Sequence, residues 1–167
     1  RLRNMTDEVD AIAAAWLAER PDLDVEPLHI LSRIGRLAQL LDERRAQAFA
    51  QHGLASHEFD VLAALRRSGP PYERTPGQLI EATHVTSGTM TNRLDRLAER
   101  NLIVRKAHPE DGRQLLVRLT ALGRRRVDAA LEELLASERA LLGGLSAAQR
   151  RSLATGLRRL LHTLADC

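Results

Sequence analysis

The sequence is poor in cysteine and in aromatic residues, and both shortages limit what the protein can be. Its single cysteine is the last residue, Cys167, so no disulfide can form within one chain, which fits a reducing compartment. Aromatic residues make up only 2% of the chain, so leucine and alanine must fill most of the core. That composition favours helices.

Long apolar runs are also missing. No stretch approaches the ~20 consecutive apolar residues that a membrane-spanning helix requires. The acidic residues Asp7, Glu8 and Asp10 stand where a signal peptide would carry its apolar region. We therefore expect a soluble cytoplasmic protein with no membrane partner.

The usual signatures of catalysis are absent from the sequence. It has no Gly-rich phosphate-binding loop, no cluster of metal ligands, and no nucleophile with a matched base. Its six histidines are scattered, and structural or solvated roles explain them better than metal binding does. We expect no enzymatic activity, no cofactor and no metal site.

Positive charge is present but modest. Lysine and arginine together number 25 against 22 acidic residues, which gives a net charge of +3, and Lys106 is the only lysine. This balance permits binding to nucleic acid without requiring it. The position of the charges along the chain is more informative than their sum.

Apolar residues recur at helical spacing over most of the chain, which predicts a mainly α fold. Thr75 opens a capping box ahead of a proline, and Ser56, Thr120 and Ser146 are the expected caps of three other helices. Two further helices are predicted before the one that Ser56 caps, and another is predicted after Val85. The first five predicted helices cover residues 6–20, 25–52, 57–67, 76–84 and 86–100, the second capped by Asp24 with Pro27 in its first turn.

The segment 86–100 predicts a helix with two unlike faces. At about 100° per residue, one side that can be buried carries Met90, Leu94, Leu97 and Asn101. The other side begins with small hydroxyl and amide groups. Such groups at a helix tip suit close approach to another molecule, and the base edges in the major groove of DNA offer them hydrogen-bond partners.

The neighbours of this segment complete a DNA-binding motif. The helix that Thr75 opens and the segment 86–100 are about three residues apart, as in a helix-turn-helix, whose second helix lies in the major groove. Residues 102–106 and 115–119 read as two strands of a basic hairpin, so we predict a winged helix-turn-helix with one short β-hairpin wing. The expected contacts to bases or phosphates come from Thr86, Ser87, Thr89, Thr91, Asn92 and Arg96; the basic residues of the hairpin are Arg105, Lys106, Arg113 and Arg118.

The terminal helices are more apolar than a small winged domain needs. Their leucines, among them Leu131, Leu135 and Leu141, are expected inside, and helices that cannot finish burying themselves usually meet a second copy. We predict a symmetric homodimer. The expected regions of one integrated domain are N-terminal dimerisation helices (1–55), a DNA-binding lobe (56–119) and C-terminal dimerisation helices (120–167).

Three spaced motifs resemble the MarR (multiple antibiotic resistance regulator) family of bacterial transcription factors. They are the helix segment 86–97, the turn Asp111-Gly112-Arg113, and the pair Leu119-Thr120, within a resemblance that covers about residues 27–165. The resemblance implies that Arg113 inserts into the minor groove and that Asp111 helps to hold the wing.

The run 16–24 is similar to the extra N-terminal helix of the urate-responsive, PecS-like and TamR-like subgroup of that family. This similarity implies that Trp16, Asp60 and Arg93 take part in the response to an anionic planar ligand, which would disturb a link between Asp60 and Arg93. The residue pattern by itself favours other roles: a solvated surface position for Asp60, and a core or dimer contact for Trp16.

The leading hypothesis is a homodimeric transcriptional regulator, a repressor that leaves a palindromic operator when a small anionic aromatic ligand, urate or a similar acid, binds. The competing hypothesis is an architectural or protein-binding winged-helix protein, which would bind DNA without sequence preference or not at all. Sequence-specific, salt-dependent DNA binding distinguishes the two.

Overall fold

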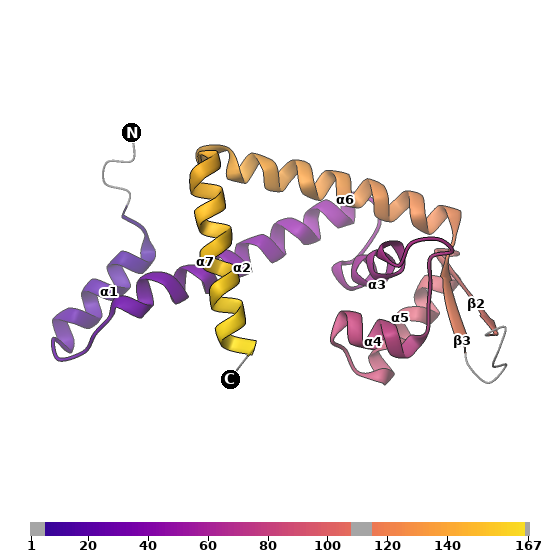
Figure 1. Cartoon of the computed structure of the whole chain (residues 1–167), viewed down its shortest axis with the longest axis horizontal. Helices are drawn as coiled ribbons and strands as arrows, with labels where there is room; N and C mark the ends of the chain where they lie inside the picture. The colour runs from indigo at the N-terminus through magenta and orange to yellow at the C-terminus, as the bar shows by residue number, and fades with distance from the viewer. Residues whose placement is uncertain (1–5, 108–114, 166–167) are drawn as a thin grey trace. The chain divides into compact units, whose positions relative to one another are not determined.

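The computed structural model describes residues 6–107 and 115–165, and its elements are labelled in Figure 1. The helices are α1 (Glu8–Glu19), α2 (Glu26–Gln51), α3 (Ser56–Arg67), α4 (Pro76–Thr83), α5 (Ser87–Glu99), α6 (Ala121–Leu141) and α7 (Ala147–Ala165), with a 3-10 turn η1 (Leu142–Gly144) before the last. The strands are β1 (Glu73–Arg74), β2 (Ile103–Ala107) and β3 (Leu115–Leu119). The mainly α, winged fold predicted from the sequence is confirmed.

Residues up to 47 and residues from 48 form two compact units. In the first unit, Arg33 of α2 joins the start of α1. Its Nε and Nη2 donate to the two carboxylate oxygens of Asp7 at 2.8 and 2.9 Å, and Nη2 also reaches Asp10 at 2.6 Å. These hydrogen bonds lower the pKa of Asp7, which is also the N-cap of α1. The finer division at residues 55 and 119 stays a prediction.

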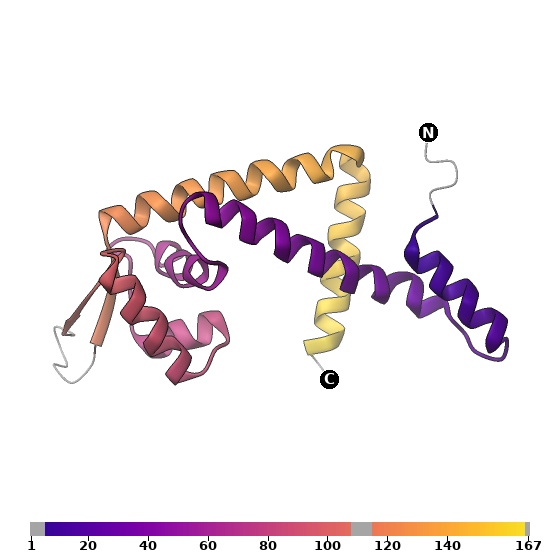
Figure 2. The ribbon, with the colours of Figure 1, turned by 180° about the vertical axis from the view of Figure 1, so that it is seen from behind.

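The core of the second unit is built around α3. Val61, Leu62 and Leu65 are completely buried, because α3 packs against α4, α5, α6 and β3. Figures 1 and 2 show α3, α4 and α5 grouped beside the strands from opposite sides. Phe49 and Phe59, the only two phenylalanines, belong to this core and stack with ring centroids 4.0 Å apart.

The wing is a three-stranded antiparallel sheet in the order β1-β3-β2. Ile103 pairs with Leu119 at the base of the predicted hairpin, and Glu73 of β1 pairs with Arg118 of β3. The prediction of a hairpin alone was therefore incomplete, because it missed β1. Two residues are too few to show a strand's alternation, and the partner strand of β1 lies more than forty residues further along the chain.

Most helix starts follow the predicted caps. Thr75 and Gln78 exchange both capping-box hydrogen bonds, and the hydroxyl groups of Thr120 and Ser146 accept backbone N–H groups of α6 and α7. Ser56 was the wrong choice for α3. The cap is Ala55, whose N–H donates to the Glu58 carboxylate at 2.9 Å, while no side chain at the cap accepts an N–H of the first turn.

The first turn of α6 is fixed to the end of the recognition segment. Thr120 Oγ1 donates to the carbonyl of Leu102 at 3.0 Å and accepts from Gly123 N–H at 2.9 Å. A Cβ atom at Gly123 would lie 2.1 Å from the Leu102 carbonyl oxygen, far inside van der Waals contact. Only glycine permits this close approach.

Many leucine side chains on the terminal helices are exposed within the single chain. α7 has no buried residue among those described, and Leu161 and Leu164 are 68% and 73% exposed. The expectation that Leu131, Leu135 and Leu141 of α6 lie inside is wrong for one copy of the chain, because the core of the second unit reaches only one face of α6.

Candidate nucleic-acid interface

The helix α5 has the two faces that its sequence predicts. Met90, Leu94 and Leu97 are buried against the core and fix the orientation of the helix. Asn101, expected on the same face, is exposed, because the helix ends at Glu99 and Asn101 takes a positive φ of 55°. The opposite face of α5 is left to solvent.

The N-terminal tip of α5 presents small polar groups. Thr86 is its N-cap, and its hydroxyl accepts the Thr89 N–H at 3.4 Å and donates to the Thr89 hydroxyl at 3.0 Å. The Thr91 hydroxyl donates to the Ser87 carbonyl at 3.1 Å, which leaves its oxygen free to accept. The predicted contact residues that the structure describes are all exposed: Thr86, Ser87, Thr89, Thr91, Asn92 and Arg96.

The preceding helix places this tip. α4 packs directly on α5, and α4 ends at His84, which adopts the left-handed conformation at φ 52°. Leu79 of α4 is completely buried. The two helices therefore form the predicted helix-turn-helix, with the polar side of α5 uncovered.

The basic residues of the wing are paired with acidic side chains. Arg105 Nη2 lies 2.7 Å from Asp95 Oδ1 of α5, and Lys106 and Arg118 both contact Glu73 of β1, Arg118 at 3.6 Å. Three cations thus share two carboxylates, so the positive charge of the predicted basic hairpin is only partly compensated in the part that is described. The predicted minor-groove residue Arg113 and the wing-supporting Asp111 lie outside the described residues.

A partly buried ion pair that the sequence did not reveal holds the far end of α5. Arg100, the C-cap residue, donates through Nη1 to both carboxylate oxygens of Glu58 at 2.6 and 2.7 Å, and through Nη2 to the Gly53 carbonyl. Burial acts to raise the pKa of Glu58, but the hydrogen bonds from Arg100 and Ala55 and the Arg100 charge outweigh it and lower the pKa. No local signal could have found this pair, because its residues are 42 positions apart.

The predicted ligand-response residues fall in different places. Arg93 is half-buried and lines a recess of about 240 Å³ together with His57, Thr89, Asn92 and Arg96. Asp60 is exposed on α3, one helical turn after His57, and among the described residues no hydrogen bond or ion pair joins it to Arg93. Trp16 belongs to the first unit and is 52% exposed.

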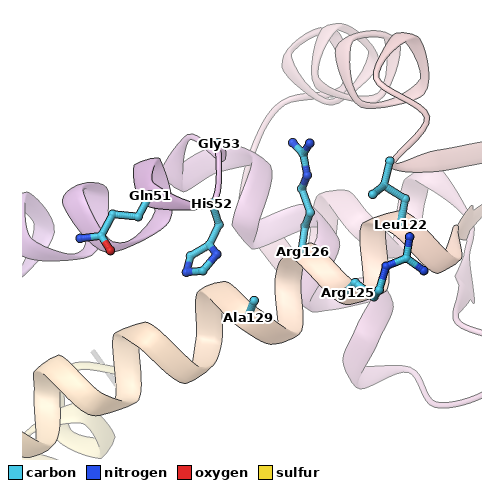
Figure 3. A pocket seen from close by; sticks show the side chains of 7 residues that line it. All are labelled: Gln51, His52, Gly53, Leu122, Arg125, Arg126 and Ala129. Carbon is cyan, nitrogen blue, oxygen red and sulfur yellow. The ribbon is translucent and has the colours of Figure 1, made fainter.

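A larger pocket of about 470 Å³ lies between the end of α2 and the start of α6 (Figure 3). The His52 ring points toward α6 near Ala129, and its Nε2 is buried without a hydrogen-bond partner in the described structure. The Arg126 side chain extends from α6, and its guanidinium group lies close to Gly53. Unpaired buried nitrogen and nearby positive charge make this pocket chemically suited to an oxygen-bearing ligand.

Two features are absent from the described part of the chain. Residues 6–107 and 115–165 hold no group of three or more histidine, cysteine or acidic side chains placed to bind a metal ion. None of their helices combines the length and the apolar character needed to cross a bilayer.

Comparison with known proteins connects this geometry with a family. The model of the MarR family matches residues 52–114, the part of the chain from α3 to the wing. The transcriptional regulator PecS of Dickeya dadantii is 35% identical over 159 residues, which cover 95% of this chain and 96% of PecS. This similarity extends over the terminal helices as well as the lobe.

Two further relatives are more distant. The transcriptional repressor NicR of Pseudomonas putida is 29% identical, over 84% of this chain and 90% of NicR. A solved structure of Bordetella bronchiseptica BpsR, whose DNA binding is described as regulated by 6-hydroxynicotinic acid, is 28% identical. It superposes with a TM-score of 0.59, over 77% of this chain and 98% of BpsR.

Proposed function

This chain belongs to the MarR family of DNA-binding transcriptional regulators, and on that premise we propose that it is a homodimeric repressor released from a palindromic operator by a small anionic aromatic ligand. The observation that carries the DNA-binding part is the exposed face of α5. Its small tip is held rigidly from behind by buried Met90, Leu94 and Leu97, which is what a helix entering a groove needs.

The chemistry of that face suits base and phosphate contacts. Thr86, Ser87 and Thr89 bear hydroxyl groups that can bind phosphate oxygens at the start of the helix, where the backbone N–H groups also point outward. Asn92 can pair with an adenine edge, and Arg96 can reach a phosphate. Arg113 is proposed to enter the minor groove, with Asp111 holding the wing.

The exposed leucines support the homodimer. A row of them on α7, with further ones on α1, α2 and α6, is more apolar surface than a monomer usually leaves in water. A second copy of the chain would cover them and place two recognition helices on half-sites about 34–36 Å apart, which a palindromic operator would match.

The ligand response is proposed to use Trp16, Asp60 and Arg93. The recess beside Arg93 supports this, because it contacts the recognition helix directly and contains two arginines for an anion. BpsR, whose regulation involves a small aromatic acid, supports the ligand class. Urate and aromatic carboxylates are therefore the ligands to test first.

The DNA-binding proposal is tested by selecting duplexes from a random library with the purified protein and measuring affinity at several salt concentrations. We expect a palindromic sequence bound at least a hundredfold more tightly than scrambled DNA, with affinity falling steeply with salt. Selection of no common sequence would support the architectural alternative instead.

The ligand proposal is tested by titrating the protein–DNA complex with urate and a panel of aromatic acids. Arg93→Gln and Asp60→Asn should weaken DNA release by the active ligand while leaving the unfolding temperature nearly unchanged. Arg126→Gln is the matched comparison, because it removes one arginine from the other pocket. If only Arg126→Gln weakens release, the ligand binds between α2 and α6 and the Asp60–Arg93 relay is wrong.

A further inference from the structure

The recognition helix carries an acidic residue on its exposed side, which is unexpected for a surface that meets DNA. Asp95 follows Asn92 by three residues and precedes Arg96, so it projects from the same side of α5 as the proposed contacts. Its side chain is 47% exposed. An unpaired carboxylate there would repel the phosphates of any duplex.

The wing supplies a positive charge that pairs with the Asp95 carboxylate. Arg105 of β2 brings Nη2 to 2.7 Å from Asp95 Oδ1, and its own side chain is 31% exposed. The two elements pack together, so the pair bridges the recognition helix and the wing strand. While the pair is intact, Arg105 contributes no net positive charge to this surface.

We infer that Asp95 is a specificity-determining residue, which restrains Arg105 and thereby keeps the protein from binding DNA of arbitrary sequence. The inference rests on the proposed DNA-binding function. Binding to arbitrary DNA comes almost entirely from phosphate neutralisation, so each arginine that is withheld lowers it. Binding to the operator depends in addition on base contacts and on the position of the wing beside α5, both of which the pair preserves.

The consequence is a difference between two kinds of DNA. Asp95→Asn keeps the size of the side chain but removes its charge, so Arg105 becomes available to any phosphate. Affinity for scrambled duplex should rise about three- to tenfold at 0.1 M salt, and the slope of log affinity against log salt should steepen by about 0.9, the value for one added phosphate contact. Affinity for the selected operator should stay within about twofold, so specificity falls.

A matched control is available in the same unit. Asp128 of α6 pairs with Arg66 of α3 at 2.8 Å, and both side chains are 38% exposed. Asp128→Asn therefore changes the net charge by the same amount and breaks a similar half-exposed pair, but one outside the recognition helix and the wing. It should leave both affinities and both salt slopes as they are in the unsubstituted protein.

The experiment measures binding of each variant to the selected operator and to a scrambled duplex across a salt series. Asp95→Glu should behave like the unsubstituted protein, and the double substitution Asp95→Asn with Arg105→Gln should return the slope to its original value. An unchanged slope in Asp95→Asn, equal gains on both DNAs, or the same gain in Asp128→Asn would overturn the inference. If the unsubstituted protein prefers no sequence, the proposed function itself fails, which is a separate result.

Discussion

The leucines of α3 and α5 and those of α7 have the same helical spacing but opposite surroundings. Leu62, Leu65 and Leu97 are completely buried, whereas Leu161 and Leu164 are more than two-thirds exposed. The difference shows that the core around α3 and α5 is complete within one chain, while α7 leaves an apolar face exposed. Substitutions that act on one region and spare the other test this division.

The largest effect is expected in the lobe core. Leu97→Ala would leave a cavity under the recognition helix, and such truncations cost about 3–4 kcal/mol of unfolding free energy. Chemical denaturation followed by circular dichroism measures this. Leu161→Ala is the matched variant, and a similar loss there that does not depend on protein concentration would contradict the division.

A somewhat smaller loss is expected from the partly buried ion pair of Glu58 and Arg100. Arg100→Gln leaves the Glu58 carboxylate, only 9% exposed, without its main partner and should cost about 2–3 kcal/mol. Folding lowers the pKa of Glu58 below its ordinary value of 4.5. The pair therefore stabilises the protein fully at pH values above 4.5, and this stabilisation is lost as the pH falls through the lower pKa of the folded state.

The pH dependence gives the control for this pair. Stability of the unsubstituted protein should fall more steeply below about pH 4.5 than that of Glu58→Gln, which has no carboxyl group to protonate at this position. Parallel curves for the two proteins, measured by thermal unfolding between pH 3 and 7, would show that the pair contributes nothing.

A third effect concerns association. If a second copy covers α7, Leu161→Ala should weaken the dimer by about 1–2 kcal/mol for each copy of the side chain removed from the interface. Sedimentation velocity over a dilution series measures the shift. Val104→Ala removes an exposed apolar side chain from the wing and should leave the dimer unchanged.

The smallest effect compares two helix caps of the same kind. Thr75 and Ser146 each exchange two hydrogen bonds with a glutamine three residues later. Thr75→Ala should cost the lobe about 1 kcal/mol. Ser146→Ala should not change the stability of the lobe measured in dilute solution, and an equal loss would mean that α7 folds as part of the same cooperative unit.

Local signals explain what the sequence could predict. The sequence predicts features that depend on residues within one or two helical turns. These are the caps at Thr75, Thr120 and Ser146 and the buried face of α5. The hydroxyl and amide residues at the tip of α5 were placed for the same reason. Each of these features is contained within one helix and its first turn.

Contacts between distant elements explain what was missed. β1 depends on β3, and the Glu58–Arg100 pair joins α3 to the end of α5, so neither leaves a pattern in the local sequence. The sequence places Arg105 in a basic hairpin but does not reveal its partner, because Asp95 lies on another element. Asn101 was misplaced because the helix ends two residues before it.

The glycine at the start of α6 has a mechanical consequence. Through Gly123 and Thr120, the first turn of α6 is clamped onto the segment that ends the recognition helix, and the rest of α6 extends from that point as a rod of 21 residues. Such a rod is about 30 Å long, so a tilt of only ~5° at the clamp displaces its free end by roughly 3 Å. A small force on the far end of α6 therefore acts as a torque on its fixed first turn, beside the recognition helix.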